Sequence, residues 1–412
     1  TVAKGKKLKF IQLCLIPIVW GSLIALPQLI ATQELSRFGL RVGNSYDFFT
    51  EYSFPPFMLP TLIFPFIFGT AYGGPYWGLW STTELIGFVG ILPLVLSIWG
   101  AVRLGRKKLH VGFFAFLVLL AFLLALGRYN PLYRLMYFAP VYNLFRVPGR
   151  HWLEVNLAIS MLSAFGLQLL LEGSDLKKKS REVLLALSIL SFLSLVFLGT
   201  GKSLFGSHFF SSLFNQNAQE LLTNAFGWDN PAISVPLAFL CLYLIWVYLL
   251  QRAGNVSSWQ KNVLLCAGIA LVLAESFAFG GYHDTNYFKS SEVRDWLSSP
   301  VMTFLKERAR YNRTVFISDE PLALFNVPAQ INTLNGYDPL MPQNVHQLLT
   351  MSSAGLSDDW GVLLQNNIIL SSLNTKFIVV PRQYVYKFRL SENKAEPGGK
   401  RSISISLGNW HF

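Results

Sequence analysis

The chain has 412 residues, of which 52% are hydrophobic and only 14% are charged. A soluble domain carries roughly 25% charged residues, and the deficit here is concentrated in apolar runs near the length of about 20 residues that spans a bilayer. This composition excludes an ordinary soluble protein, and it makes the net charge of +12 a signal of membrane topology and not of nucleic-acid binding.

Basic residues at the ends of the apolar runs predict the topology. Lysines at 4–9 precede the first run, 10–31, and so place the N-terminus in the cytoplasm. Basic residues at 103–108, at 177–181 and at Arg252 with Lys261 mark further inner loops. The later spans are then the runs 84–102, 111–127, 152–171, 184–199, 232–250 and 263–280.

These runs predict a mainly α, multi-pass helical bundle of about seven spans in the cell membrane, over residues 1–281. Everything after Gly281 then lies outside, as an extracytoplasmic α/β domain over residues 282–412. Cys14, Cys241 and Cys266 all fall inside apolar runs, so the sequence indicates neither a disulfide framework nor a thiolate metal site. The chain begins at Thr1 without a cleavable signal pattern, and we expect it to be a fragment of a longer protein.

The stretch 54–80 is apolar enough to enter the bilayer, but it is rich in proline and glycine, which break a long helix. Counting it as a span would also put the basic cluster 103–108 outside. We therefore predict a re-entrant or interfacial segment packed on protein at the outer side, since irregular backbone at membrane depth needs protein or a wet cavity around it. An ordinary broken helix remains the alternative.

The loop 128–152 carries four arginines and no acid, and the predicted topology places it outside, where basic residues are sparse. One explanation is an anionic ligand such as a lipid-linked phosphate, because the planar guanidinium matches phosphate oxygens. The other is contact with lipid headgroups, or pairing with outer acids such as Glu154. Glu154 follows Arg150 at i, i+4 and lies in the first turn of its helix, which favours a structural pair for that residue.

Further candidates lie near the same face. Glu84, Glu154 and Glu275 stand at the outer ends of predicted spans, where ionisable residues are functional candidates. The loop 32–53 adds Arg37, Asp47 and Glu51.

The region after Gly281 predicts a helix at 290–310, strands at 313–318 and 376–381, helices at 342–351 and near 358–365, and a last strand at 402–407. It lacks a recognisable catalytic constellation, and we expect a binding module. Asp338, in the turn NGYDPL, is a candidate for a supporting role, although capping of that turn is the favoured reading. The whole chain shows no phosphate loop, HExxH, GxSxG or zinc spacing.

Five segments, in chain order, resemble the YfhO family of bacterial membrane proteins, which are similar to GT-C-type glycosyltransferases. They are LPQLIATQELSR (26–37), YGGPYWG (72–78) with TELIGFVG (83–90), GRYNPLYRLMYFAPVYNLFRVPGR (127–150), LNGYDPLMPQNVHQLL (334–349) and SLNTKFIVVP (372–381). The resemblance implies sugar transfer at the outer face, from a polyprenyl-phosphate carrier to a cell-envelope polymer. On this reading Arg128, Arg146, Arg150 and Arg37 bind the lipid phosphate.

The resemblance also implies an acidic general base, often with a divalent metal, in a first outer loop that we expect to precede this fragment. The catalytic acid is then expected outside this fragment, with Asp47 and Glu51 as candidates within it. The expected partners are membrane lipids, the polyprenyl-linked sugar and the polymer acceptor, without nucleic acid. The alternative is a non-enzymatic lipid transporter or assembly scaffold, although transport usually shows polar residues at mid-bilayer depth and internal repeats.

Overall fold

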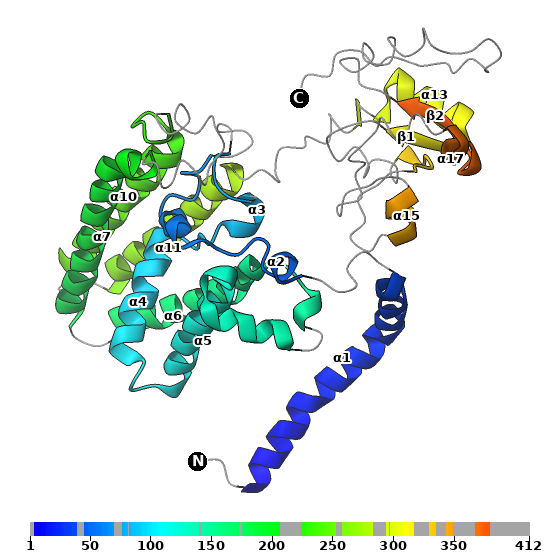
Figure 1. The fold of residues 1–412 in the computed structure, drawn as a ribbon. Helices are drawn as coiled ribbons and strands as arrows, with labels where there is room; N and C mark the ends of the chain where they lie inside the picture. Colours follow the sequence, from blue (N-terminus) through cyan, green and yellow to red (C-terminus); the bar gives the residue numbers. More distant parts are fainter. Residues whose placement is uncertain are drawn as a thin grey trace. The chain divides into compact units, whose positions relative to one another are not determined.

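The computed structural model describes a defined part of the chain, and it divides the chain into two units. The described residues are 4–38, 45–69, 76–80, 82–139, 142–172, 175–206, 224–252, 258–282, 294–295, 297–316, 329–334, 343–348 and 367–379. One unit is Asn44–Tyr287, and the other combines Thr1–Gly43 with Phe288–Phe412. Each unit is described by itself (Figure 1).

The protein is mainly helical, as the sequence predicts. Within the described residues, five helical stretches are long and apolar enough to cross a membrane, namely Leu15–Leu35, Pro148–Leu171, Leu176–Phe205, Pro231–Arg252 and Asn262–Gly281. Two shorter apolar helices, Ile91–Leu104 and Leu109–Ala125, occupy the places of the second and third predicted spans. The helices support a membrane protein, while the count of about seven spans and their direction stay predictions.

The larger unit is built from α4 (Ile91–Leu104), α5 (Leu109–Ala125), α6 (Trp152–Leu171), α7 (Leu176–Phe205), α10 (Pro231–Arg252) and α11 (Ser258–Tyr282). Helix α6 packs against α4 and α5, and α10 packs against α7 and α11. Helices α4 and α6 approach closely at two glycines, since a Cβ on Gly100 would lie 2.9 Å from the Cα of Gly166. Small residues at such a crossing let two backbones meet, as is common between membrane helices.

Helix α4 begins later than the predicted span at 84–102. Residues 82–85 form a separate turn, α3 (Thr82–Leu85), and the chain then runs without regular structure to Gly90. Gly90 has a φ of 98°, in the left-handed region that glycine tolerates. The helix therefore starts at Ile91, and Glu84 lies outside it.

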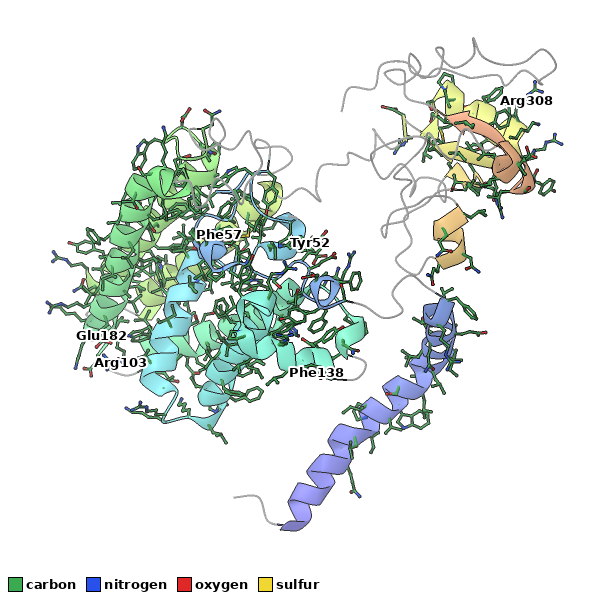
Figure 2. All side chains as sticks on the ribbon, in the orientation of Figure 1. Tyr52, Phe57, Arg103, Phe138, Glu182 and Arg308 are labelled. Carbon is green, nitrogen blue, oxygen red and sulfur yellow. The ribbon has the colours of Figure 1, made fainter. Side chains whose placement is uncertain are left out.

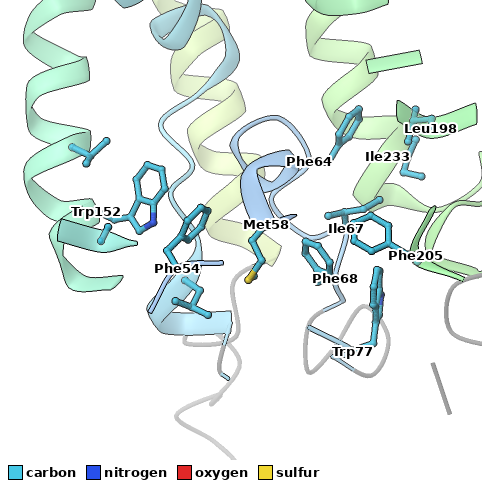
Figure 3. Packing of buried hydrophobic residues seen from close by; sticks show 14 of the residues in the cluster. Phe54, Met58, Phe64, Ile67, Phe68, Trp77, Trp152, Leu198, Phe205 and Ile233 are labelled. Carbon is cyan, nitrogen blue, oxygen red and sulfur yellow. The ribbon is translucent and has the colours of Figure 1, made fainter. Parts of the chain in front are cut away.

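The described residues of the segment 54–80, namely 54–69 and 76–80, pack into the bundle without a long helix. These described residues contain one 3-10 helix, η1 (Pro56–Leu62), and no helix of membrane-spanning length. Phe54, Phe68 and Trp77 belong to a buried cluster that also holds Trp152 and Phe205 (Figure 3). The Phe54 and Trp152 rings are 4.8 Å apart, and the Phe68 and Trp77 rings 4.6 Å. Contact with protein on this scale is what the re-entrant interpretation requires, although the depth of the segment in a membrane stays a prediction.

Helix α1 (Lys4–Phe38) belongs to the other unit. Its apolar side chains are exposed, as at Ile24 and Ile30, which suits a helix surrounded by lipid.

The C-terminal part of that unit contains α13 (Pro300–Ala309), α15 (Gln343–Leu348), α17 (Asn367–Ser372) and a parallel pair of strands, β1 (Arg313–Phe316) and β2 (Thr375–Val379). Both strands and the helices α13 and α15 lie where the sequence predicts such elements. Parallel pairing needs a long crossover between the strands. The predicted helix near 358–365, the strand 402–407 and Asp338 lie outside the described residues.

Candidate functional site

The arginine loop folds as a chain of short 3-10 helices. They are η2 (Gly127–Tyr129), η3 (Pro131–Phe138), η4 (Tyr142–Leu144) and η5 (Pro148–His151). Pro131 and Pro148 occupy the first turns of η3 and η5, where the missing N–H costs nothing. Asn130 fixes the entry to η3, because its side chain accepts from Leu132 N at 3.1 Å and donates to Leu123 O at 2.9 Å. The loop is thus tied to the end of α5.

Residues 45–54 lie directly against this loop. Ser53 Oγ accepts from the backbone N–H of Arg128 at 2.9 Å, and Tyr52 O accepts from Gly149 N at 3.1 Å. Phe49, in α2 (Tyr46–Phe49), stacks on Tyr133 with ring centroids 5.0 Å apart. The structure therefore brings the two candidate acids of this segment, Asp47 and Glu51, to the arginines.

Two of the candidate arginines are held by carboxylates. Arg146 Nη1 lies 2.7 Å from Glu51 Oε2. Arg150 donates twice to Glu84, with Nε 3.1 Å from Oε2 and Nη2 2.7 Å from Oε1. Pairing with outer acids, one of the two explanations that the sequence left open, accounts for part of the arginine set. The carboxylate of Glu84 is not the partner expected for Arg150, since spacing alone had pointed to Glu154.

Glu154 instead contacts a histidine that the sequence analysis overlooked. His151 Nδ1 lies 3.4 Å from Glu154 Oε1, and its Nε2 lies 2.7 Å from the Tyr142 hydroxyl. The chain of contacts continues to Tyr133, whose hydroxyl lies 3.4 Å from that of Tyr142. Burial raises the pKa of Tyr142 and of Tyr133 above the ordinary tyrosine value, so both phenols stay protonated at neutral pH and can donate. The signal in the sequence was the spacing of His151 and Glu154 at i, i+3.

Arg128 has a different environment from Arg146 and Arg150. Its Nη2 donates to Thr50 Oγ1 at 3.2 Å and to the backbone oxygen of Asp47 at 3.4 Å. Its Cζ lies 5.4 Å from the centroid of the Trp80 ring. The side chain is exposed, and within the described part of the chain it forms no ion pair with a carboxylate. Its Nε and Nη1 donors are thus open to a ligand.

Aromatic rings connect Arg128 to Arg146. The Cζ of Arg146 lies 5.8 Å from the Tyr52 ring, and the Tyr52 and Trp80 rings are 5.3 Å apart. A guanidinium stacked on a ring keeps its donors directed outward in its own plane. We call Arg128, Trp80, Tyr52 and Arg146 the stacked cluster.

Backbone strain coincides with the stacked cluster. Tyr52, Trp80 and Val147 have φ values of 57°, 63° and 71°. Bulky residues rarely adopt this left-handed conformation, which costs on the order of 1–3 kcal/mol at each position and is concentrated at functional sites. Two of these residues belong to the cluster, and Val147 follows Arg146 directly.

The other candidates have separate environments. Arg37 is exposed in α1, in the other unit, and Asp338 lies outside the described residues. The carboxylate of Asp47 is exposed and forms no ion pair within the described residues. Those residues also contain no group of three or more His, Cys, Asp or Glu side chains arranged to hold a metal.

Comparison with protein-family models, with curated proteins and with solved structures finds no match to this chain.

Proposed function

We propose that this protein binds a polyprenyl-phosphate-linked sugar at the outer face of the cell membrane and transfers the sugar to a cell-envelope polymer. The proposal combines the resemblance to the YfhO family and to GT-C-type glycosyltransferases with one structural observation. That observation is the exposed guanidinium of Arg128, stacked over Trp80 and bonded to Thr50, but without a carboxylate partner in the described chain.

Phosphate is the ligand that best suits this environment. Arg128 is anchored at Nη2, and its Nε and Nη1 donors, which lie on different edges of the planar guanidinium, can each donate to a phosphate oxygen. Arg146 and Arg150 have their charges compensated by Glu51 and Glu84. We therefore assign direct phosphate contact to Arg128 and a supporting role to the paired arginines.

Asp47 is the acid whose position best suits chemistry beside that phosphate. Its backbone oxygen accepts from Arg128, and its carboxylate is exposed. An exposed carboxylate can take the proton of an acceptor hydroxyl group as the sugar is transferred. The resemblance, however, expects the catalytic acid in a preceding part of the protein, so a role for Asp47 is tested separately from phosphate binding.

Affinity for a polyprenyl phosphate, measured on the purified chain in lipid nanodiscs, tests the assignment. A charge-assisted hydrogen bond contributes roughly 1.5–3 kcal/mol, so Arg128→Ala should weaken binding by roughly ten- to a hundredfold. Arg128→Lys keeps the charge but loses the planar set of donors held over Trp80, and should restore only part of the affinity. The matched control is Arg134→Ala, because Arg134 lies exposed in the same loop over Tyr46.

Equal affinities for Arg128→Ala, Arg134→Ala and the unaltered protein would exclude a phosphate site at Arg128. If Arg128→Lys bound as tightly as the unaltered protein, Arg128 would be a contact to lipid headgroups instead. Asp47→Asn separates the enzyme from the scaffold alternative, if the complete protein is assayed. Loss of sugar transfer with unchanged phosphate affinity supports catalysis by Asp47, whereas unchanged transfer places the base elsewhere.

A further inference from the structure

A buried glutamate, Glu275, lies in the C-terminal part of α11. It is far from the stacked cluster in the sequence, and its hydrogen bonds are to other residues. Glu275 is only 3% exposed, and it falls within the candidate membrane span Asn262–Gly281. Both of its carboxylate oxygens lie 3.2 Å from the backbone N–H of Ile91, which begins α4. The Tyr243 hydroxyl of α10 donates to Oε2 at 2.7 Å. One side chain thus joins three helices.

The carboxyl group of Glu275 lacks a cationic partner among the described residues. None of the ion pairs formed by the described residues includes it. Buried charges are normally paired, because removal from water is costly. The two hydrogen-bond donors stabilise the carboxylate without neutralising it, and Oε1 receives only the shared contact from Ile91. A further donor carrying positive charge would complete the site.

Glu275 also lines a recess with an otherwise apolar wall. The wall includes Pro65, Phe66, Phe88, Pro236, Phe239 and Phe279. Phe279 stacks on Phe66 with ring centroids 5.3 Å apart and lies 5.0 Å from Phe88. Such a wall suits a compact hydrophobic body.

The second polar side chain of the recess is already engaged. Asn230 donates to Asn224 O and Ala225 O at 3.1 and 3.2 Å, and its Oδ1 accepts from Ala232 N at 2.9 Å. Of the two polar side chains that line the recess, Glu275 is the one that carries an acidic group.

We propose that this recess binds a small hydrophobic amine, with its ammonium group on Glu275 and its apolar body against the phenylalanines and prolines. Charge complementarity selects the occupant, since a carboxylate in an apolar wall attracts a cation and repels an anion. The site is therefore distinct from the proposed phosphate site. The Glu275 carboxylate also disfavours a zwitterionic lipid headgroup, because binding of its amine would bring the headgroup phosphate towards the same carboxylate.

Three probes of one shape test the proposal: adamantan-1-amine, adamantan-1-ol and adamantane-1-carboxylate. Binding to the purified chain in detergent is measured by calorimetry at neutral pH. The amine should bind at least tenfold more tightly than the alcohol, and the carboxylate should bind most weakly. Glu275→Gln keeps an acceptor for Ile91 but removes the charge, and it should reduce the preference for amine over alcohol to less than twofold.

Two further variants locate the probe. Ala278→Trp should block all three probes, because Ala278 lines the recess. Glu182→Gln is the matched control, since Glu182 pairs with Arg103 and hydrogen-bonds Trp99 elsewhere in the bundle, and it should leave the preference unchanged. Equal binding of amine and alcohol to the unaltered protein overturns the proposal. An amine preference that survives Glu275→Gln, or amine binding that survives Ala278→Trp, overturns it as well.

Discussion

Arg150 and Glu84 form a two-bond ion pair that connects η5, directly before α6, to the turn α3, 66 residues earlier in the chain. The Arg150 side chain is 68% exposed and that of Glu84 is 26% exposed. Arg146 and Glu51, the neighbouring pair, are 23% and 31% exposed. Two pairs of the same chemistry thus lie in one loop with different access to water.

Double-mutant cycles should give a larger coupling energy for Arg146 and Glu51 than for Arg150 and Glu84. An exposed pair contributes about 0.5 kcal/mol, and the less exposed pair should contribute about 1 kcal/mol or more because water screens it less. Unfolding in mixed micelles, with Ala at each position, measures both energies. Raising the salt concentration should reduce the Arg150 coupling more than the Arg146 coupling. The reverse order would show that burial does not decide the strength of these pairs.

The sequence predicted the elements that depend on local pattern. Apolar length located the helices, and the β-branched and aromatic runs RTVFIS (313–318) and KFIVVP (376–381) located β1 and β2 to within about two residues. It did not predict which acid each arginine meets, because residues that pair across 66 or 95 positions leave no periodic signal. The nearest acid in sequence, Glu154, was assigned to Arg150, and its observed contact is His151. The placement of charges along the sequence predicted that these basic and acidic residues share one face, while the choice of partner needed the fold.

Tyr133 should make the protein less stable at alkaline pH. Burial, followed by the hydrogen bond with Tyr142, raises the pKa of Tyr133 above the ordinary value of 10.0. The folded state therefore holds the phenol proton more tightly than the unfolded state. This contribution to stability is fully present below pH 10.0 and is lost as the pH rises towards the folded-state pKa.

Tyr133→Phe removes this titration, so the free energy of unfolding should fall less steeply above pH 10.0 in the variant than in the unaltered protein. Chemical unfolding at a series of alkaline pH values measures the two slopes. Comparison of slopes makes the test independent of any uniform loss of stability from the substitution. Identical alkaline slopes would mean that Tyr133 does not titrate with unfolding.

Phe54→Ala should destabilise the bundle strongly. The Phe54 side chain is fully buried, and its ring meets Trp152 edge to face with centroids 4.8 Å apart. Deletion of a buried phenylalanine ring costs about 3–5 kcal/mol through lost transfer energy and the cavity left behind. Phe138→Ala is the control, since that ring is 73% exposed and should cost far less. A small loss for Phe54→Ala would show that the segment 54–69 is not an integral part of the core.

Accessibility of single cysteines should place the arginine loop and the C-terminal part on the same side of the membrane. Cys241 and Cys266 are exposed on their helices, so all three native cysteines are first replaced by serine. Cysteines are then introduced one at a time at Tyr129, Lys107 and Ser298, which are exposed positions.

If α4 and α5 both cross the bilayer and the segment 54–80 does not, a membrane-impermeant maleimide should label positions 129 and 298 in intact cells. Position 107, in the basic loop between α4 and α5, should react only after permeabilisation, since basic loops stay in the cytoplasm. Labelling at 107 from outside would mean that the segment 54–80 crosses after all. Arg128 would then face the cytoplasm, and a lipid-linked donor presented at the outer surface could not reach it.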